Sequence, residues 1–330
     1  MSERRYLAPL PLGGDEGPPW SKGLMARALA ATGLTPTRAY ELARRADADM
    51  MQRCALELDL DRLAEIAPDV LGEPEAGRTM RRLRQLQALQ HLELPVLLLV
   101  GGATGTGKST LATEVAHRLG ITRVTSTDFI RQTMRAFFSR EFMPSVHYSS
   151  FEAELGLSRA DEDLADDAAL LGFLDQTRNV LVGVEAAIDR SLTEGWSMVL
   201  EGVHIVPGMI AVDRADALVV QCVVAISDEH AHRSHFWVRD ASTDGLRPLE
   251  KYLEGMTEIR MIQDVLLERA RRFDVPVIEN MTLDDAIGQV LDLVLTGAER
   301  LSLPSPSIAK IPEGAGLPAD GFVRQGPGRA

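Results

Sequence analysis

An apolar run that ends in a glycine-rich loop constrains this chain more than any other stretch. Residues 96–100, Val-Leu-Leu-Leu-Val, have the length and composition of a buried strand. Residues 102–109, Gly-Ala-Thr-Gly-Thr-Gly-Lys-Ser, match the pattern G-x-x-x-x-G-K-[ST], and residues 110–119 read as a helix. Strand, glycine loop and helix in this order are the context that a phosphate-binding loop requires. The alternative, a glycine turn that matches by coincidence, is weaker because both flanking elements are present.

The residue types in this loop suit a nucleoside triphosphate. Glycines let the backbone curl so that several N–H groups converge on phosphate oxygens, and the helix start adds a favourable dipole. Lys108 would reach the β- and γ-phosphates, and the Ser109 hydroxyl would coordinate Mg²⁺. The predicted nucleotide-binding residues are Gly102, Ala103, Thr104, Gly105, Thr106, Gly107, Lys108, Ser109 and Thr110.

Strand-like runs alternate with helical periodicity from Leu94 onward, which is typical of a parallel sheet. We predict an α/β fold, a P-loop NTPase-type five-stranded parallel sheet flanked by helices, with a small mainly helical N-terminal domain. The connection between the second and third strands, residues 127–196, is unusually long and mostly helical in pattern. The predicted strands are residues 96–100, 123–126, 197–200, 217–225 and 275–278.

Periodicity and breaks divide the chain further. Ser21 is a candidate cap for a helix that extends to Thr32. This pattern and two more, from Pro36 to Leu58 and from Leu60 to Leu71, place a small domain before the sheet. A helix with apolar residues at every third position follows, and we expect it to pack against the next domain. The predicted units are a small domain at 1–72, a linker helix at 73–93, a kinase-like domain at 94–300 and a disordered Pro/Gly-rich tail at 301–330.

Charge and composition restrict the partners. A net charge of −13 argues against binding to nucleic acid or to an anionic membrane surface, so a small anionic substrate would need a local basic pocket. Apolar runs stay well below the roughly 20 residues of a membrane span. Two cysteines far apart in sequence and an N-terminus without a signal-peptide core predict a cytoplasmic protein. Whether copies of the chain form a homo-oligomer is left open.

Polar residues follow the second predicted strand at the edge where ligands bind in open α/β sheets. Asp128 is placed to face the γ-phosphate and to accept the proton of an acceptor hydroxyl, although it would also suit a helix cap. Arg131 and Arg135 follow at i and i+4, a spacing that lets two guanidinium groups clamp a carboxylate or phosphate of a substrate. The alternative for this pair is a solvated basic face.

The third predicted strand is followed by Glu201 and His204. A carboxylate beside a phosphate loop predicts that Glu201 positions Mg²⁺, while a plain strand-end acid is the alternative. His204 is a candidate substrate contact or a loop histidine with a structural hydrogen bond.

A basic segment, residues 228–239, lies between the fourth and fifth strands. Its histidines invite a zinc site, but cysteine partners and a tetrahedral spacing are absent from the segment. We predict instead a lid on which Arg233 and Arg239 stabilise charge on the transferred phosphoryl group.

These motifs together resemble the 2-phosphoglycerate kinases of methanogenic archaea and their bacterial relatives. The string Glu-Gly-Val-His-x-Val-Pro-Gly at residues 201–208 is more specific than the phosphate loop. Residues 18–71 look like the ATP-cone-type module of such kinases, and for this module nucleotide binding and a purely structural role are both left open. The resemblance rests on residues 101–109, 126–135, 144–151 with its serine pair, 200–208, 232–239, 251–253 with 259–260, and 275–280.

The resemblance implies transfer of a phosphoryl group from ATP, with Mg²⁺, to 2-phosphoglycerate, giving 2,3-bisphosphoglycerate. An acceptor with one phosphate and one carboxylate suits a site that contains several arginines. Another phosphorylated acceptor, such as a sugar phosphate, an inositol phosphate or a nucleotide sugar, is the first alternative. A regulator that senses ATP without catalysis is the second, and a polynucleotide kinase is disfavoured by the net charge of −13.

Overall fold

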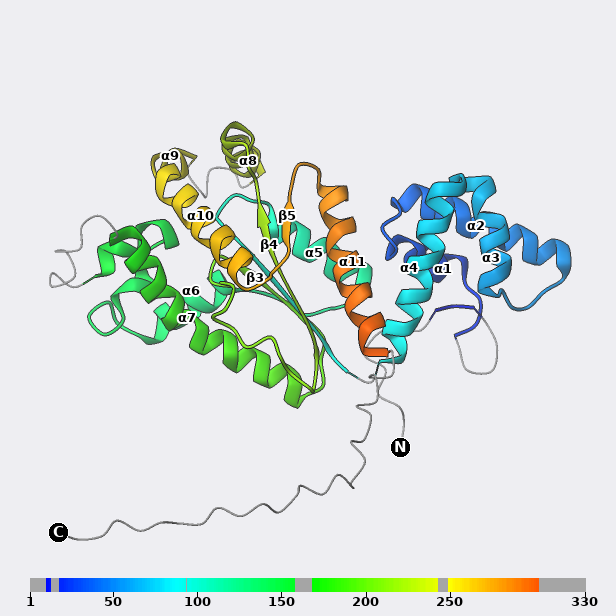
Figure 1. Ribbon diagram of the computed structural model, residues 1–330, viewed down its shortest axis with the longest axis horizontal. Coiled ribbons are helices and arrows are strands. Elements are labelled where there is room, and N and C mark those ends of the chain that lie inside the picture. Colours follow the sequence, from blue (N-terminus) through cyan, green and yellow to red (C-terminus); the bar gives the residue numbers. More distant parts are fainter. Residues whose placement is uncertain (1–9, 13–17, 93, 158–167, 243–248, 303–330) are drawn as a thin grey trace, which may run out of the picture.

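A five-stranded parallel sheet forms the centre of the molecule in the computed structural model (Figure 1). The structure describes residues 10–12, 18–92, 94–157, 168–242 and 249–302. The strand order is β2-β3-β1-β4-β5, which confirms the predicted fold class. The strands are β1 (Val96–Gly102), β2 (Val124–Ser126), β3 (Met198–Gly202), β4 (Leu218–Ala225) and β5 (Val277–Glu279).

The register of the sheet brings the carboxyl ends of the strands to one edge. The central strand β1 is buried along its whole length, as its apolar sequence requires, and it pairs with β3 and β4. Gly101 of β1 is opposite Gly202 of β3, and Ser126 of β2 is opposite Glu201. The phosphate-binding loop and the segments that follow β2 and β3 therefore begin side by side.

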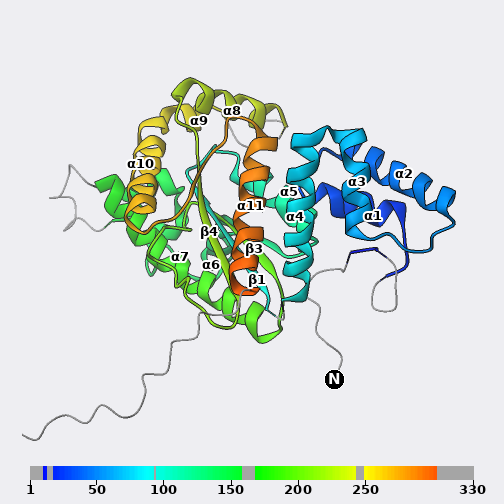
Figure 2. The ribbon, with the colours of Figure 1, turned by 45° about the vertical axis from the view of Figure 1, so that its right-hand side comes forward.

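Helices cover both faces of the sheet (Figures 1 and 2). On one face the apolar side chains of β4, among them Cys222 and Val224, pack with α5 and α11. On the other face lie α7 and α10. The long connection after β2 is mostly helical, as predicted. The helices from the phosphate loop onward are α5 (Lys108–Leu119), α6 (Thr127–Phe137), η1 (Pro144–His147), η2 (Ser150–Gly156), α7 (Ala168–Thr193), α8 (Glu229–Ser242), α9 (Leu249–Glu254), α10 (Met256–Arg272) and α11 (Leu283–Ser302).

Four helices precede the sheet: α1 (Lys22–Ala30), α2 (Pro36–Arg53), α3 (Leu60–Leu71) and α4 (Glu73–His91). Ser21 caps α1 by accepting a hydrogen bond from the Leu24 amide, as its position suggested. The second helix ends at Arg53, earlier than the predicted Leu58, because Cys54 adopts a left-handed φ of 51° that stops the helix. Most of the predicted C-terminal tail, residues 303–330, lies outside the described residues.

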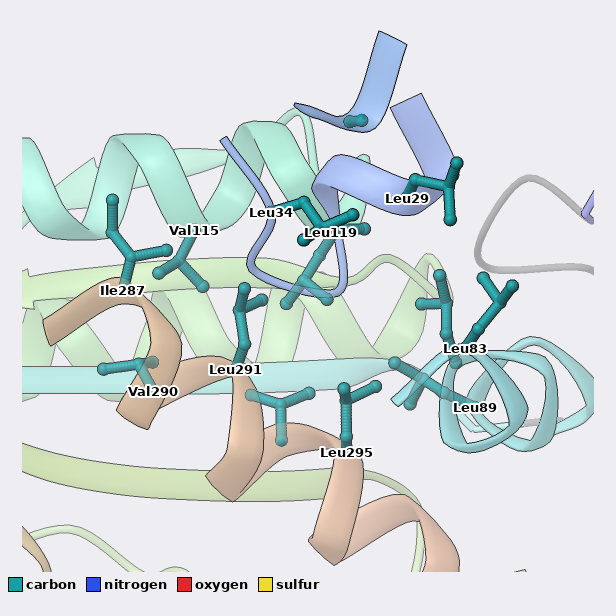
Figure 3. Close-up of a cluster of buried hydrophobic side chains, with 14 of the residues drawn as sticks. Leu29, Leu34, Leu83, Leu89, Val115, Leu119, Ile287, Val290, Leu291 and Leu295 are labelled. Atoms are coloured by element: carbon teal, nitrogen blue, oxygen red, sulfur yellow. The ribbon is translucent and has the colours of Figure 1, made fainter. Parts of the chain in front are cut away.

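The N-terminal helices share one hydrophobic core with a face of the sheet. Figure 3 shows Leu83 and Leu89 of α4 beside Leu291 and Leu295 of α11, with Leu29 of α1 in the same cluster. The linker helix thus packs against the sheet domain, as its apolar periodicity predicted. Within the described residues, no helix combines the length and the apolar character that crossing a membrane requires.

Arg82 ties α4 to α11 from the edge of this core. Its guanidinium makes a bidentate ion pair with Asp292 of α11, in which Nε donates to Oδ1 at 2.6 Å. Its Nη1 also donates to the carbonyl of Thr32, at 2.7 Å, in the turn between α1 and α2. The arginine side chain is 17% exposed and the Asp292 side chain 42%, so water reaches this ion pair mainly from the carboxylate side. One side chain therefore joins three segments that are distant in sequence.

We predict that Arg82→Met lowers the free energy of unfolding by about 1–2 kcal/mol, because the stem still packs while the charged hydrogen bonds are lost. Urea unfolding followed by circular dichroism measures this change. The matched control is Arg84→Met on the same helix, whose side chain is 55% exposed and pairs weakly with Asp61. It should cost less than about 0.5 kcal/mol. Equal effects for the two variants would contradict the role given to Arg82.

Candidate active site

The glycine loop turns between β1 and α5 in a conformation that needs glycine at two positions. Gly105 and Gly107 have φ values of 88° and 82°, in the left-handed region that side chains disfavour. A Cβ at Gly105 would overlap the Phe236 ring of α8, and a Cβ at Gly107 would overlap the amide of Asn280. The loop is thus shaped by its own glycines and by close approach of two later segments.

Three side chains hold successive carbonyl groups of this loop. His232 Nε2 donates to the Thr104 carbonyl at 2.8 Å, and His235 Nδ1 donates to the Gly105 carbonyl at 3.1 Å. Asn280, after β5, donates from Nδ2 to the Thr106 carbonyl at 2.9 Å. Sequence reasoning gave these residues no such role, since it weighed the histidines for zinc and left Asn280 unassigned. They fix the carbonyl side of the loop against α8 and the end of β5.

A pocket of about 300 Å³ lies at the carboxyl edge of the sheet. The loop contributes Lys108 and Ser109, while Thr110 is exposed outside this lining. The edge of the sheet contributes Asp128 and Glu201. The remaining lining comes from the long connection, from the segment after β3 and from α9, namely Arg131, Gln132, Ser149, Ser150, Phe151, His204 and Tyr252 among others. Sequence reasoning about the site omitted Ser150 and Tyr252, which come from two separate segments.

Asp128 lies in the first turn of α6 with its side chain 58% exposed. The helix cap is Ser126, whose hydroxyl accepts from the Phe129 amide at 3.0 Å, so the alternative role of Asp128 as a cap is wrong. Both Nε and Nη2 of Arg131 donate to Asp128 Oδ1, at 2.9 and 2.8 Å. The other carboxylate oxygen has no hydrogen-bond partner in the part of the chain that the structure describes.

Arg131 uses its guanidinium mainly for hydrogen bonds within the protein. Besides Asp128, its Nη1 donates to the carbonyls of Val146 and Tyr148, at 2.8 Å each. Arg135 is exposed and does not line the pocket. The structure therefore does not assemble the predicted clamp of two guanidinium groups. The i, i+4 spacing put both residues on one side of α6, but Arg131 folds back onto the 146–148 segment.

Glu201 and His204 are both buried at the end of β3, with 6% and 1% exposure. Glu201 Oε2 is a buried oxygen without a hydrogen-bond partner among the described residues. A buried, unpartnered carboxylate oxygen in a pocket that Ser109 also lines is the kind of ligand that a divalent cation takes. His204 differs, because both of its ring nitrogens are already bonded within the protein.

The hydrogen bonds of His204 define its tautomer. The Gln176 amide nitrogen donates to the carbonyls of Ser145 and Tyr148, so Gln176 Oε1 accepts from His204 Nε2 at 3.0 Å. His204 Nδ1 then accepts from the Thr127 hydroxyl at 2.8 Å. Burial, together with the smaller effect of the nearby Arg131, lowers the pKa of His204 to about 3. His204 is thus a neutral support for the pocket wall rather than a charged group.

Arg233, one of the two arginines predicted for a lid, does not lie at the loop. Arg233 forms an ion pair with Glu229 at 2.8 Å and lines a separate surface groove together with Arg260 and Asp264. The physical reason is the helical period of α8, which turns His232 and His235 toward the loop and Arg233 away from it. Arg239 belongs to α8, and its side chain lies outside the described part of the structure.

The parallel sheet, the glycine loop and the polar pocket define an ATP-dependent phosphotransferase of the P-loop class. No family model matches the chain. Proteins named 2-phosphoglycerate kinase do match it over most of its length: that of Methanopyrus kandleri is 37% identical over 289 residues, covering 86% of this chain and 87% of that protein. That of Methanothermobacter thermautotrophicus is 38% identical, covering 86% and 93%. The chain belongs to the 2-phosphoglycerate kinase family.

A more distant relative by sequence agrees. The 2-phosphoglycerate kinase of Pyrococcus horikoshii is 31% identical over 277 residues, covering 84% of this chain and 90% of that protein. Among solved structures, one from Chloroflexus aurantiacus covers 62% of this chain with 14% identity and a TM-score of 0.29, a likeness too low to carry an argument.

The neutral state of His204 predicts a pH dependence of stability. In the unfolded chain, His204 binds a proton below its ordinary pKa of 6.5. In the folded protein it stays unprotonated until about pH 3. As the pH is lowered through that window, this group therefore decreases the free energy of unfolding by about 1.4 kcal/mol per pH unit. In His204→Gln this contribution is absent, so urea unfolding at pH 7 and pH 5 should give a smaller loss than in the wild type. Equal losses would contradict the buried neutral histidine.

Proposed function

We propose that this protein transfers the γ-phosphoryl group of ATP to the hydroxyl of 2-phosphoglycerate, giving 2,3-bisphosphoglycerate. The observation that carries the proposal is the single pocket shared by Lys108 and Ser109 of the phosphate loop, Asp128 after β2, and Glu201 of β3. A phosphate loop by itself binds nucleotide. A carboxylate with an open oxygen in the same pocket supports transfer to a hydroxyl.

The residues suit an in-line transfer. The acceptor hydroxyl oxygen forms the new bond to the γ-phosphorus, the bond to the β–γ bridging oxygen breaks, and ADP leaves with that electron pair. Asp128, whose second oxygen is open, takes the hydroxyl proton. Arg131 fixes the carboxylate through Oδ1 and so aims the open oxygen. Lys108 stabilises negative charge on the β- and γ-phosphates.

Glu201 and Ser109 would hold Mg²⁺. The fit rests on the buried and unpartnered Glu201 Oε2 and on the presence of both residues in the pocket lining. When bound, the ion would neutralise charge on the phosphates of ATP.

The acceptor side of the pocket is polar. Arg131 supplies a positive charge that is paired with Asp128, and the adjacent Ser149 and Ser150 line the wall that Arg131 and Gln176 hold in place. Hydroxyl groups of this kind accept and donate to phosphate and carboxylate oxygens. The names of the relatives support 2-phosphoglycerate as the acceptor, and a direct role for Arg135 stays a prediction.

Lys108→Ala should lower kcat by at least about 100-fold, because a charge that stabilises the transferring phosphoryl group is lost. ADP release coupled to NADH oxidation measures turnover with ATP and 2-phosphoglycerate. Asp128→Asn should cause a loss of similar size through the missing proton acceptor. Circular dichroism verifies that both variants fold. Wild-type turnover in Lys108→Ala would overturn the mechanism.

A panel of acceptors tests the substrate. Phosphorus NMR of the product should show two phosphomonoester signals of 2,3-bisphosphoglycerate when 2-phosphoglycerate is supplied. Unphosphorylated glycerate should turn over at least about 100-fold more slowly, since it lacks the charged hydrogen bonds of the phosphate. Preferred turnover of a sugar phosphate or an inositol phosphate would replace the proposed acceptor. ATP binding without turnover of any acceptor would favour a regulator.

Glu201→Gln should raise the Mg²⁺ concentration needed for half-maximal rate by about 10-fold or more, since an anionic ligand group becomes neutral. Titration of Mg²⁺ at saturating ATP measures this change. The matched control is Glu185→Gln, an exposed carboxylate on α7, which should leave the Mg²⁺ requirement unchanged. An unchanged requirement in Glu201→Gln would remove Glu201 from the metal site.

A further inference from the structure

His232 contacts the phosphate loop and an aromatic neighbour at the same time. It is fully buried, and its Nε2 donates to the Thr104 carbonyl at 2.8 Å. Its Nδ1 has no partner in the described part of the chain, and burial lowers its pKa, so the ring is neutral. The ring stacks on Phe236, one helical turn further along α8, with centroids 5.6 Å apart and an interplanar angle of 20°.

The stack continues to a wall of the pocket. Phe236 stacks on Tyr252 of α9, with centroids 5.1 Å apart and an angle of 7°. Tyr252 then meets Phe151 of η2 at 5.8 Å, in a tilted arrangement. Both Tyr252 and Phe151 line the pocket, beside Ser149 and Ser150. A row of rings therefore runs from a carbonyl of the phosphate loop to the side where the acceptor is proposed to bind.

In this row of rings, close packing would couple a displacement of one ring to its neighbours. Phe236 is 1% exposed and packs directly against Gly105, so neither the loop nor α8 can shift without moving the ring. Close-packed interiors pass displacement from one contact to the next because they contain few voids. Offset and near-parallel rings also have a preferred separation. A loop held in one arrangement by ATP thus favours one arrangement of Tyr252.

We propose that His232 is a positioning residue and that the row His232–Phe236–Tyr252 links the two substrates, so that ATP and the acceptor each strengthen binding of the other. This inference rests on the proposed function, because the acceptor is taken to bind beside Tyr252. Linkage requires the effect to be reciprocal. The affinity of 2-phosphoglycerate should rise at least about 5-fold when an ATP analogue is bound, and the affinity of the analogue should rise by the same factor.

Two substitutions separate the roles of His232. His232→Gln keeps an N–H donor for the Thr104 carbonyl and removes the ring. Binding of the ATP analogue alone should stay within about 2-fold of the wild type, while the linkage factor falls toward 1. His232→Phe keeps a ring and removes the donor. It should weaken the analogue alone by about 5-fold or more, as a lost hydrogen bond to the loop would.

Isothermal titration calorimetry on the full chain measures each ligand alone and with the other saturating, using a non-hydrolysable ATP analogue and 2-phosphoglycerate. Phe236→Leu provides a second break in the row and should also bring the linkage factor toward 1. Its matched control is Trp237→Leu, the next residue on α8, whose side chain is 61% exposed. This control should retain the wild-type factor. Thermal melting verifies that the variants fold.

The outcomes distinguish the two proposals. If both ligands bind to the wild type with a linkage factor below about 2, the link fails while the proposed function stands. If His232→Gln or Phe236→Leu keeps the wild-type factor, the row of rings is not the path and the inference is overturned. If the ATP analogue binds and 2-phosphoglycerate does not, the proposed function fails, and the link to an acceptor at Tyr252 fails with it.

Discussion

The hydrogen bonds to the carbonyl side of the phosphate loop are the constraint on which the rest of the site depends. Thr104, Gly105 and Thr106 are held in turn by His232, His235 and Asn280, from α8 and from the end of β5. These partners meet the loop because of the strand order, in which β4 and β5 lie on one side of β1, while β3 and β2 lie on its other side. The nucleotide side of the pocket is thus fixed by one half of the sheet, and the carboxylates Asp128 and Glu201 come from the other half.

Burial decides which groups in the pocket carry charge. His204 stays neutral because it is enclosed and because Arg131 lies nearby. The charged side chains of the pocket are therefore two cations and two carboxylates, namely Lys108, Arg131, Asp128 and Glu201. The chain as a whole carries −13, which repels anions at long range. At short range, hydrogen bonds and shielded charges outweigh that field, because salt screens distant charges and contacts inside a pocket are screened less. An anionic substrate can therefore be bound by an acidic protein.

The local sequence was sufficient to predict those parts of the structure that local interactions determine. The glycine loop, the Ser21 cap and the buried strand β1 follow from residue types within a few positions, and each lies where it was predicted. Partners distant in sequence could not be read in this way. Arg131 looked like a ligand for anions because nothing near it in sequence reveals the Tyr148 carbonyl that it binds. The hydrogen bonds of Gln176 to His204 and to the Tyr148 carbonyl could not be predicted for the same reason, since they depend on where α7 packs.

The shared core bears on the role of the N-terminal helices, which sequence left open between nucleotide binding and structural support. Leu83 of α4 and Leu291 of α11 belong to one cluster that also includes Leu119 of α5. Without the N-terminal helices, this face of α5 and α11 would be exposed to water, and exposing apolar surface costs about 25 cal/mol per Å². The helix α5 begins at Lys108, and α11 begins three residues after Asn280. The N-terminal helices therefore support α5, which continues from the phosphate loop, and α11, which follows the Asn280 that contacts the loop, whether or not they bind a nucleotide themselves.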